Sequence, residues 1–427
     1  MSALLIRLYW LDSNERGVVV YNLLSGMRVI EGSAFVAAPL GGMTLGQLGA
    51  EVIRFDPIGG GMDHKRWPLD NKGNSLYWAG LNKGKKSIAV NSRESEGREI
   101  IEALICQPGP DNGIFLTNHP PGGVYNFDKL KARRKDLIML NVLGSHDGTP
   151  AVDYTINCAL GFPFATGPRG GERPVNHLLP AWDLVTGSMA ATGILAAERQ
   201  RSRTGCGNLV KLALSDIGIW VASALGHIAE ASLLDKNRTA DGNHIYGAFG
   251  HDFLTLDGKR IMLTALTKAQ WRRLKMAVEI TKPVIEFEND KNLNLDNEGD
   301  RYIARDNIVA MIEPWVASRD YSNVKNILEK AGVLWGPYQN FTELLKNDPR
   351  CSVQNPLIEV KNQPEIGSYP MAGLPLRFHD LANMPVKAAP LLGENTDEVL
   401  SDILGMPDHN IADLHDRGII GGVVVSV

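Results

Sequence analysis

The segment that most constrains the fold is residues 27–56, MRVIEGSAFVAAPLGGMTLGQLGAEVIRFD. An apolar run, a glycine-rich bend, a short helix with Leu45 and Leu48 on one face, and a second apolar run that ends at Asp56 predict a β-α-β unit. The glycines do not follow the G-x-G-x-x-G order that lets a backbone approach a pyrophosphate. We therefore expect them to allow close packing of the helix on the sheet, and not to bind NAD.

Strand and helix patterns continue to alternate through about residue 220, which predicts a doubly wound, mostly parallel sheet. Ser92 or Ser95 is positioned to cap the next helix. The predicted strands are KKSIAV (85–90), GIFLTN (113–118) and LIMLNVLG (137–144), and the predicted helix is SRESEGREIIEALI (92–105).

The pattern changes near Gly242. In FLTLDGKRIMLTAL (253–266), the Asp257-Gly258 pair predicts a hairpin with a type I′ turn. We expect a helix at TKAQWRRLKMAV (267–278), a solvated loop at ENDKNLNLDNEGD (288–300), and a late helix in APLLGENTDEVLSDILG (389–405) that Asn395 or Thr396 caps. The predicted division is an N-terminal extension of uncertain order (1–22), a large domain (23–221), a small domain (222–334) and a return to the large domain (335–427).

The composition is that of a globular protein without a nucleic-acid partner. The 44 Lys and Arg residues against 48 Asp and Glu residues give a net charge of −4, so no basic field attracts a polyanion. The four cysteines are far apart and no metal-ligand spacing occurs, which predicts no metal site and a reducing, cytoplasmic compartment. The apolar run at residues 1–11 is too short to span a bilayer and lacks signal-peptide features, so we expect no membrane association or export.

The segment LLPAWDLVTGSMAATGILAAERQRSRTG (178–205) begins with one ionisable group, Asp183. Its carboxylate is placed to cap a helix over residues 184–199 by accepting hydrogen bonds from the first N–H groups. The residues alone leave a catalytic role open as the alternative.

Five segments in order resemble the class III coenzyme A transferases, a family that includes formyl-CoA transferase, carnitine-CoA transferase and the α-methylacyl-CoA racemases. The resemblance runs from Leu24 to Ile420. It implies a Rossmann-like large domain built from both chain ends, an inserted smaller α+β domain and an interlocked homodimer. Its segments are 26–61, LNKGKKSIAV (81–90), TNHPPGG (117–123), 180–214 and PLLGENTDEVL (390–400).

The resemblance implies that Asp183, in a D-x-x-x-G pattern with Gly187, is the nucleophile. In such enzymes the carboxylate attacks an acyl-CoA thioester, forms a mixed anhydride, and then carries CoA as an aspartyl thioester. We expect the helix N-terminus to keep the carboxylate ionised. The racemase branch needs a histidine where Val152 stands, so two-base racemisation lacks one base; Asp153, beside it, has a structural or a functional role.

The resemblance also implies where the thioester binds, with coenzyme A as part of the substrate and no separate cofactor. Pro57 replaces the arginine that usually follows the second strand, which makes Arg54 a candidate substitute. The CoA-binding residues implied are Val36, Ala37, Arg54, Leu81, Asn82, Lys83, Lys85 and Asn118.

Within the family, the residues most resemble members that act on 2-methylfumaryl-CoA, moving CoA between the two carboxyl groups of one acid in the 3-hydroxypropionate cycle. The alternatives are CoA transfer between two acids, such as succinyl-CoA with mesaconate or itaconate, and a non-catalytic CoA-binding protein. The free carboxylate requires a cationic or hydrogen-bonding partner. The candidates are His64, Lys65, Arg66, His177, Tyr246, Gly247, Gly250 and His251, and the 242–250 loop ranks first among them.

Overall fold

The computed structural model describes residues 22–423, so the predicted extension at 1–22 lies almost wholly outside the described residues. The chain forms two compact units. The large unit contains the segments up to residue 160, 178–229 and from 349 onward, and the small unit contains 161–177 and 230–348.

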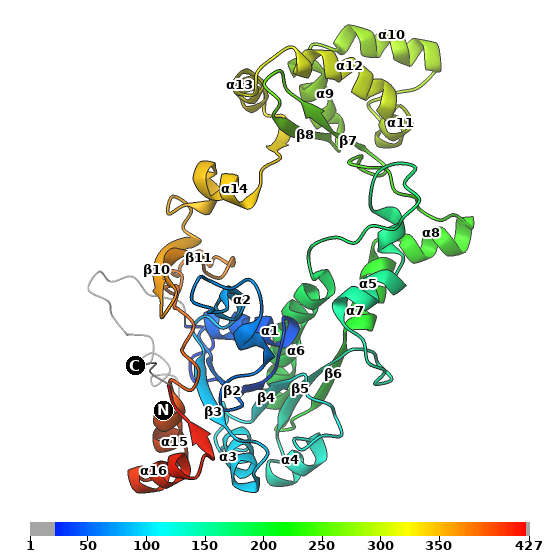
Figure 1. Cartoon of the computed structure of the whole chain (residues 1–427). Helices are drawn as coiled ribbons and strands as arrows, with labels where there is room; N and C mark the ends of the chain where they lie inside the picture. The colour runs from blue at the N-terminus through cyan, green and yellow to red at the C-terminus, as the bar shows by residue number, and fades with distance from the viewer. Residues whose placement is uncertain (1–21, 424–427) are drawn as a thin grey trace. The chain divides into compact units, whose positions relative to one another are not determined.

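A seven-stranded sheet forms the centre of the large unit (Figure 1), and its strand order is β12-β3-β2-β1-β4-β5-β6. All neighbours are parallel except β12, which pairs antiparallel with β3 and brings the C-terminal segment to the edge of the sheet. Strands β1, β4 and β5 are buried along almost their whole length because helices cover both faces of the sheet. The strands are β1 (Arg28–Gly32), β2 (Glu51–Asp56), β3 (Lys86–Val90), β4 (Ile114–Thr117), β5 (Ile138–Leu143), β6 (Leu209–Ala213) and β12 (Ile420–Gly421). The predicted mixed α/β sheet is confirmed.

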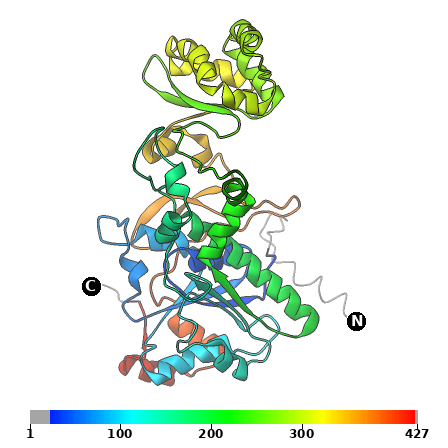
Figure 2. The same ribbon diagram turned by 90° about the vertical axis from the view of Figure 1, so that its right-hand side faces the viewer.

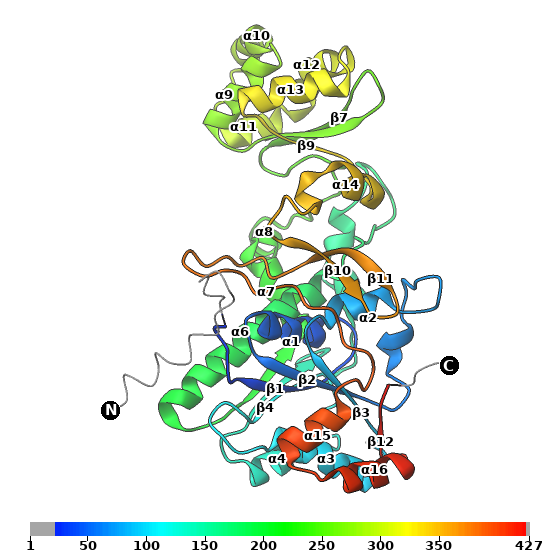
Figure 3. The same ribbon diagram turned by 90° about the vertical axis from the view of Figure 1, so that its left-hand side faces the viewer.

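Helices α1 (Ala37–Gln47) and α6 (Ala181–Thr204) cover one face of this sheet, while α3 (Ser95–Ile105), α4 (Phe127–Arg133), α15 (Thr396–Leu404) and α16 (Asp408–Asp416) cover the other (Figure 3). Figure 2 shows α6 as a long green helix beside the strands. The second face holds a continuous core of buried residues from α3, α4, α15 and α16. The remaining elements of this unit are α2 (Leu76–Leu81), α5 (Asp153–Ala159), α7 (Leu214–Ala224), the β10 (Ile358–Gln363) and β11 (Gly367–Ala372) hairpin, and short 3₁₀ turns at Met62–Lys65 and Pro349–Cys351; α8 (His227–Leu234) begins in it.

Two glycines of the first β-α-β unit allow close packing of α1: Gly42 against the sheet, as predicted, and Gly41 against α6. A Cβ atom on Gly42 would lie 1.9 Å from Glu31 Oε2, and one on Gly41 would lie 3.1 Å from Ala190 Cβ in α6. Gly187 is the reciprocal contact, because its Cβ would lie 2.8 Å from the Ala37 carbonyl oxygen. Glycine in the D-x-x-x-G pattern therefore permits α1 and α6 to approach each other.

The small unit holds an antiparallel sheet of β7 (Phe249–Leu254), β8 (Arg260–Ala265) and β9 (Leu334–Pro337). Its core centres on Trp271 and Phe249, both fully buried. Its helices are α9 (Lys268–Ala277), α10 (Thr281–Lys291), α11 (Glu298–Ile303), α12 (Arg305–Ala317), α13 (Tyr321–Ala331) and α14 (Phe341–Asn347), with a 3₁₀ turn at Phe162–Ala165.

Local details correct four predictions. The β7–β8 hairpin is present, but Leu254 pairs with Arg260 across a five-residue loop, and only Gly258 in that loop has positive φ, so it is not a type I′ turn. The predicted loop at 288–300 is helical at both ends. Helix α3 is not capped by a serine, because it begins at Ser95 and follows Glu94. Asn395 precedes α15 without capping it through its side chain.

Candidate active site

A pocket of about 420 Å³ opens in the large unit beyond the carboxyl ends of β4 and β5. Ligands bind at this edge in open parallel sheets, because the loops after the strands leave a crevice there. The start of α1, the loop after the first 3₁₀ turn, α2, α5 and α6 supply the remaining wall. The lining includes Phe35, Val36, Ala37, Arg66, Tyr77, Asn118, Val152, Asp153 and Asp183.

Asp183 lies in this pocket but is not the cap of α6, which corrects the sequence prediction. The helix begins at Ala181, two residues before Asp183, and its N-cap position is Pro180, whose side chain cannot accept a hydrogen bond. Asp153 of α5 performs the capping instead: its Oδ2 accepts from the Trp182 N–H at 2.7 Å and from the Asp183 N–H at 3.0 Å. Because the capping is done from outside, the Asp183 carboxylate remains available to the pocket.

Burial, together with the nearby charge of Asp153, raises the pKa of Asp183 to about 7, and the charge of Arg66 opposes this rise. The expectation that the helix N-terminus keeps this group ionised is therefore wrong, because loss of hydration outweighs the helix dipole. Near neutral pH both the carboxylate and the acid form of Asp183 are therefore populated.

The turn before α1 is held in a strained conformation by side chains from two other loops. Phe35 has φ of 67°, a value that bulky residues rarely adopt. Its N–H lies 3.0 Å and 2.9 Å from the two carboxylate oxygens of Asp63. Asn118 accepts from the Ala34 N–H at 3.1 Å and donates to the Ala34 carbonyl at 2.9 Å. These contacts fix the backbone that forms one wall of the pocket.

Asp63 belongs to a buried charge network beneath this turn. Arg54 donates from Nε to Asp56 at 2.8 Å and from Nη2 to Asp63 at 3.2 Å. Lys85 Nζ donates to Glu31 at 2.9 Å, and burial lowers the pKa of Lys85 to about 8. Buried charges are retained only when they are paired, so the network holds the loops in one arrangement.

The residues that the resemblance implied for CoA binding fall into two groups. Val36, Ala37 and Asn118 line the pocket. The others do not: Arg54, Asn82 and Lys85 are buried in or beside the charge network, Leu81 ends α2, and Lys83 Nζ donates to the Ala372 carbonyl at 2.6 Å.

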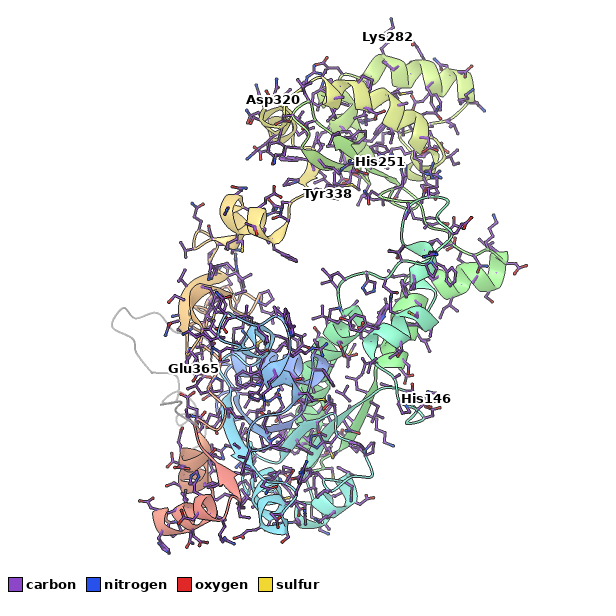
Figure 4. The ribbon with its side chains drawn as sticks, viewed as in Figure 1. His146, His251, Lys282, Asp320, Tyr338 and Glu365 are labelled. Carbon is purple, nitrogen blue, oxygen red and sulfur yellow. The ribbon has the colours of Figure 1, made fainter. Side chains whose placement is uncertain are left out.

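The candidates for binding the free carboxylate of the substrate also fall into two groups, one near the first 3₁₀ turn and one in the small unit. Of the three near the first 3₁₀ turn, Arg66 lines the pocket, Lys65 is exposed, and His64 packs on Trp78 with ring centroids 4.4 Å apart. The remaining candidates lie in the small unit, which includes His251 (labelled in Figure 4). His251 stacks on His244 with ring centroids 4.2 Å apart, and Tyr246 donates to Glu230 at 2.5 Å. His177, Gly247 and Gly250 complete this group, and Gly250 lies in β7.

Sequence reasoning missed the contributions of Phe35, Asp63 and Tyr77. Asp63 follows the glycine bend, but its bond to Phe35 spans 28 residues and carries no local signal.

Within residues 22–423, no single helix is long and apolar enough to cross a membrane; only the bent pair α7 and α8 passes such a test, on length and composition.

Comparisons with known proteins agree with the fold and identify the family. CoA-transferase family III matches residues 24–396. The 2-methylfumaryl-CoA isomerase of Chloroflexus aurantiacus is 52% identical over 402 residues, which cover 94% of this chain and 98% of that protein. Human succinyl-CoA:glutarate CoA-transferase is 25% identical over 411 residues, which cover 93% of this chain and 90% of that protein. The crystal structure of a CAIB/BAIF family protein from Brucella suis has the same fold, with a TM-score of 0.72 at 22% identity over 90% of this chain and all of that one. The chain belongs to CoA-transferase family III.

Proposed function

We propose that this protein converts 2-methylfumaryl-CoA to 3-methylfumaryl-CoA by moving CoA between the two carboxyl groups of one molecule, with Asp183 as the nucleophile. The observation that carries the proposal is the 52% identity, over nearly the full length of both chains, to a protein named 2-methylfumaryl-CoA isomerase. The pocket adds a half-buried carboxylate without a hydrogen-bond donor among the described residues. Such a carboxylate suits covalent catalysis.

The first half of the reaction places CoA on the protein. An Asp183 oxygen attacks the thioester carbonyl carbon, the C–S bond breaks, and CoA leaves as its thiolate with a mixed anhydride formed. The thiolate then attacks the Asp183 carbonyl carbon, the anhydride C–O bond breaks, and 2-methylfumarate is released into the pocket as a carboxylate. The second half reverses these two steps at the other carboxylate and regenerates Asp183.

The start of α1 supports the charged intermediates. Val36 and Ala37 line the pocket where the first N–H groups of the helix lack intrahelical acceptors, and no side chain caps this end. Such N–H groups stabilise an oxyanion that develops on an attacked carbonyl. The strained Phe35 and the Asn118 contacts hold these groups before substrate arrives.

We propose further that the protein works as a homodimer in the cytoplasm. Helix α7 exposes Ile219 and Trp220 in the single chain, and a second chain would remove this apolar area from water. Sedimentation velocity tests the assembly, since a monomer at micromolar concentration contradicts it.

The test of the reaction uses purified protein and 2-methylfumaryl-CoA without added acid, with chromatographic separation of the two CoA isomers. We expect 3-methylfumaryl-CoA from the wild type, none from Asp183→Asn, and wild-type rates from Asp402→Asn, a matched change at an exposed aspartate of α15. A requirement for a second acid would favour transfer between two acids. Full activity in Asp183→Asn would leave that aspartate without a catalytic role.

A further inference from the structure

Arg66 brings an unpaired positive charge into the same pocket as Asp183. It lines the pocket, is half-buried, and forms no ion pair with any carboxylate of the described residues. It is nevertheless close enough to Asp183 to oppose the rise in that group's pKa. A half-buried cation without a counter-ion is costly unless a ligand supplies the negative charge.

Two aromatic rings hold the guanidinium in place. Its central carbon lies 5.3 Å from the ring centroid of Phe35 and 5.1 Å from that of Tyr77. Stacking on ring faces orients an arginine without occupying its N–H donors. The main chain of Arg66 is also held in position, because the Ser75 hydroxyl donates a hydrogen bond to the Arg66 carbonyl at 2.6 Å.

The support beneath Arg66 reaches the buried charge network. Phe35 keeps its strained backbone through Asp63, and Asp63 is itself paired with Arg54. A ring held this rigidly fixes the cation stacked on it, so the site is formed before ligand binds. The neighbouring basic residues do not share this arrangement, because Lys65 is exposed and His64 packs on Trp78.

We propose that Arg66 binds the acyl carboxylate that is not being transferred, and so selects CoA thioesters of dicarboxylic acids. This inference rests on the proposed function. In 2-methylfumarate only two carbon atoms separate the carboxyl groups, so a cation that shares the pocket with the nucleophile is within reach of the second one. The CoA phosphates are a full pantetheine arm away from the thioester and are the less suitable source of the anion.

One cation serves both halves of the proposed reaction. While Asp183 exchanges CoA with one carboxyl group, Arg66 holds the other. When the released 2-methylfumarate reverses its orientation in the pocket, the carboxylate that faced Asp183 comes to face Arg66, and the other comes to face Asp183. Retention by a charge-assisted contact, bidentate where geometry allows, explains how the free diacid stays in the pocket without an external acceptor.

The test measures binding rather than turnover. Calorimetry compares two unreactive thioethers of similar size, S-(3-carboxypropyl)-CoA and S-butyl-CoA, which differ by a terminal carboxylate. We expect the wild type to prefer the carboxylate by about tenfold or more, Arg66→Gln to bind both equally, and Arg66→Lys to retain part of the preference. Lys65→Gln, the matched control on the exposed neighbour, retains the wild-type ratio.

Two results would overturn the inference: no preference in the wild type, or an unchanged preference in Arg66→Gln. An unchanged preference accompanied by an equal loss of affinity for both thioethers would assign Arg66 to a CoA phosphate. The proposed function is judged separately, by isomerisation of 2-methylfumaryl-CoA by the wild type. A wild type that isomerises while Arg66→Gln keeps its preference removes only the role of Arg66.

Discussion

Asp183 is the residue on which the proposed chemistry depends, and its ionisation decides when that chemistry can occur. The nucleophile is the carboxylate, whose pKa burial raises to about 7. We therefore expect the rate to rise with pH through about 7 and to reach a plateau above it, with about one tenth of the plateau at pH 6. A pH profile of kcat/KM that stays flat from pH 5 to 8 would contradict this value.

The same shift gives Asp183 a pH-dependent effect on stability. Its folded pKa lies above the unfolded value of 3.8, so the native state binds the proton more tightly and loses stability as pH rises through about 7. Asp183→Asn removes that loss. We expect the variant to melt a few degrees higher than the wild type at pH 8 and at nearly the same temperature at pH 4; differential scanning calorimetry checks both.

Asp153 affects Asp183 through charge and through capping, and two substitutions separate these effects. Asp153→Asn keeps an oxygen acceptor for the Trp182 and Asp183 N–H groups but removes the negative charge. We expect its pH profile to move to lower pH with little loss of stability. Asp153→Ala also loses the cap and is expected to cost about 1 kcal/mol or more of unfolding free energy, measured by denaturant titration. A pH profile of activity whose midpoint is unchanged in both variants would contradict the electrostatic role.

At the scale of elements, the turn before α1 depends on a side chain from a different loop. Asp63→Ala removes the acceptor for Phe35 and leaves Arg54 with fewer buried partners. We expect a loss of about 3 kcal/mol in unfolding free energy, together with weaker binding of carboxylate-bearing thioethers. Asp402→Ala, at an exposed position, serves as the control and is expected to change neither. An equally stable Asp63→Ala protein would show that the network does not hold the turn.

The α1–α6 contact gives a second prediction at this scale. A methyl group on Gly187 would lie 2.8 Å from a main-chain oxygen of α1, which cannot move aside without shifting the helix. We expect Gly187→Ala to cost about 1–3 kcal/mol and to reduce activity, because both helices contribute to the pocket. Gly299→Ala, in α11 with nothing within 4 Å of the added atom, is the control and is expected to be neutral or stabilising. Denaturant titration measures both changes.

At the scale of the whole molecule, the features that the sequence predicts correctly are those that a local residue pattern encodes. Buried parallel strands appear as apolar runs, so the strands from β1 to β5 and the α1 helix were predictable. Asp183 stands out in the sequence as the one ionisable group at the start of an apolar segment of small residues, and the family resemblance implies its role as the nucleophile. The cap of α6 was assigned to the wrong aspartate, because Asp153 reaches it from 29 and 30 residues away.

The details of the pocket wall were beyond sequence reasoning for the same reason. Phe35, Asp63 and Arg54 come from separate segments, and nothing in their spacing shows that they meet. The raised pKa of Asp183 also depends on burial, which one sequence does not measure. Arg66 was one of several basic candidates until the pocket separated it from its neighbours.

The most direct test of the account is whether 2-methylfumarate stays bound during the transfer. Wild-type protein is incubated with unlabelled 2-methylfumaryl-CoA and an excess of free ¹³C-labelled 2-methylfumarate, and the 3-methylfumaryl-CoA formed is analysed by mass spectrometry. The account predicts an unlabelled product, because both carboxyl groups belong to one trapped molecule. Label entering the product in proportion to the free pool would show exchange with solution and would contradict intramolecular transfer.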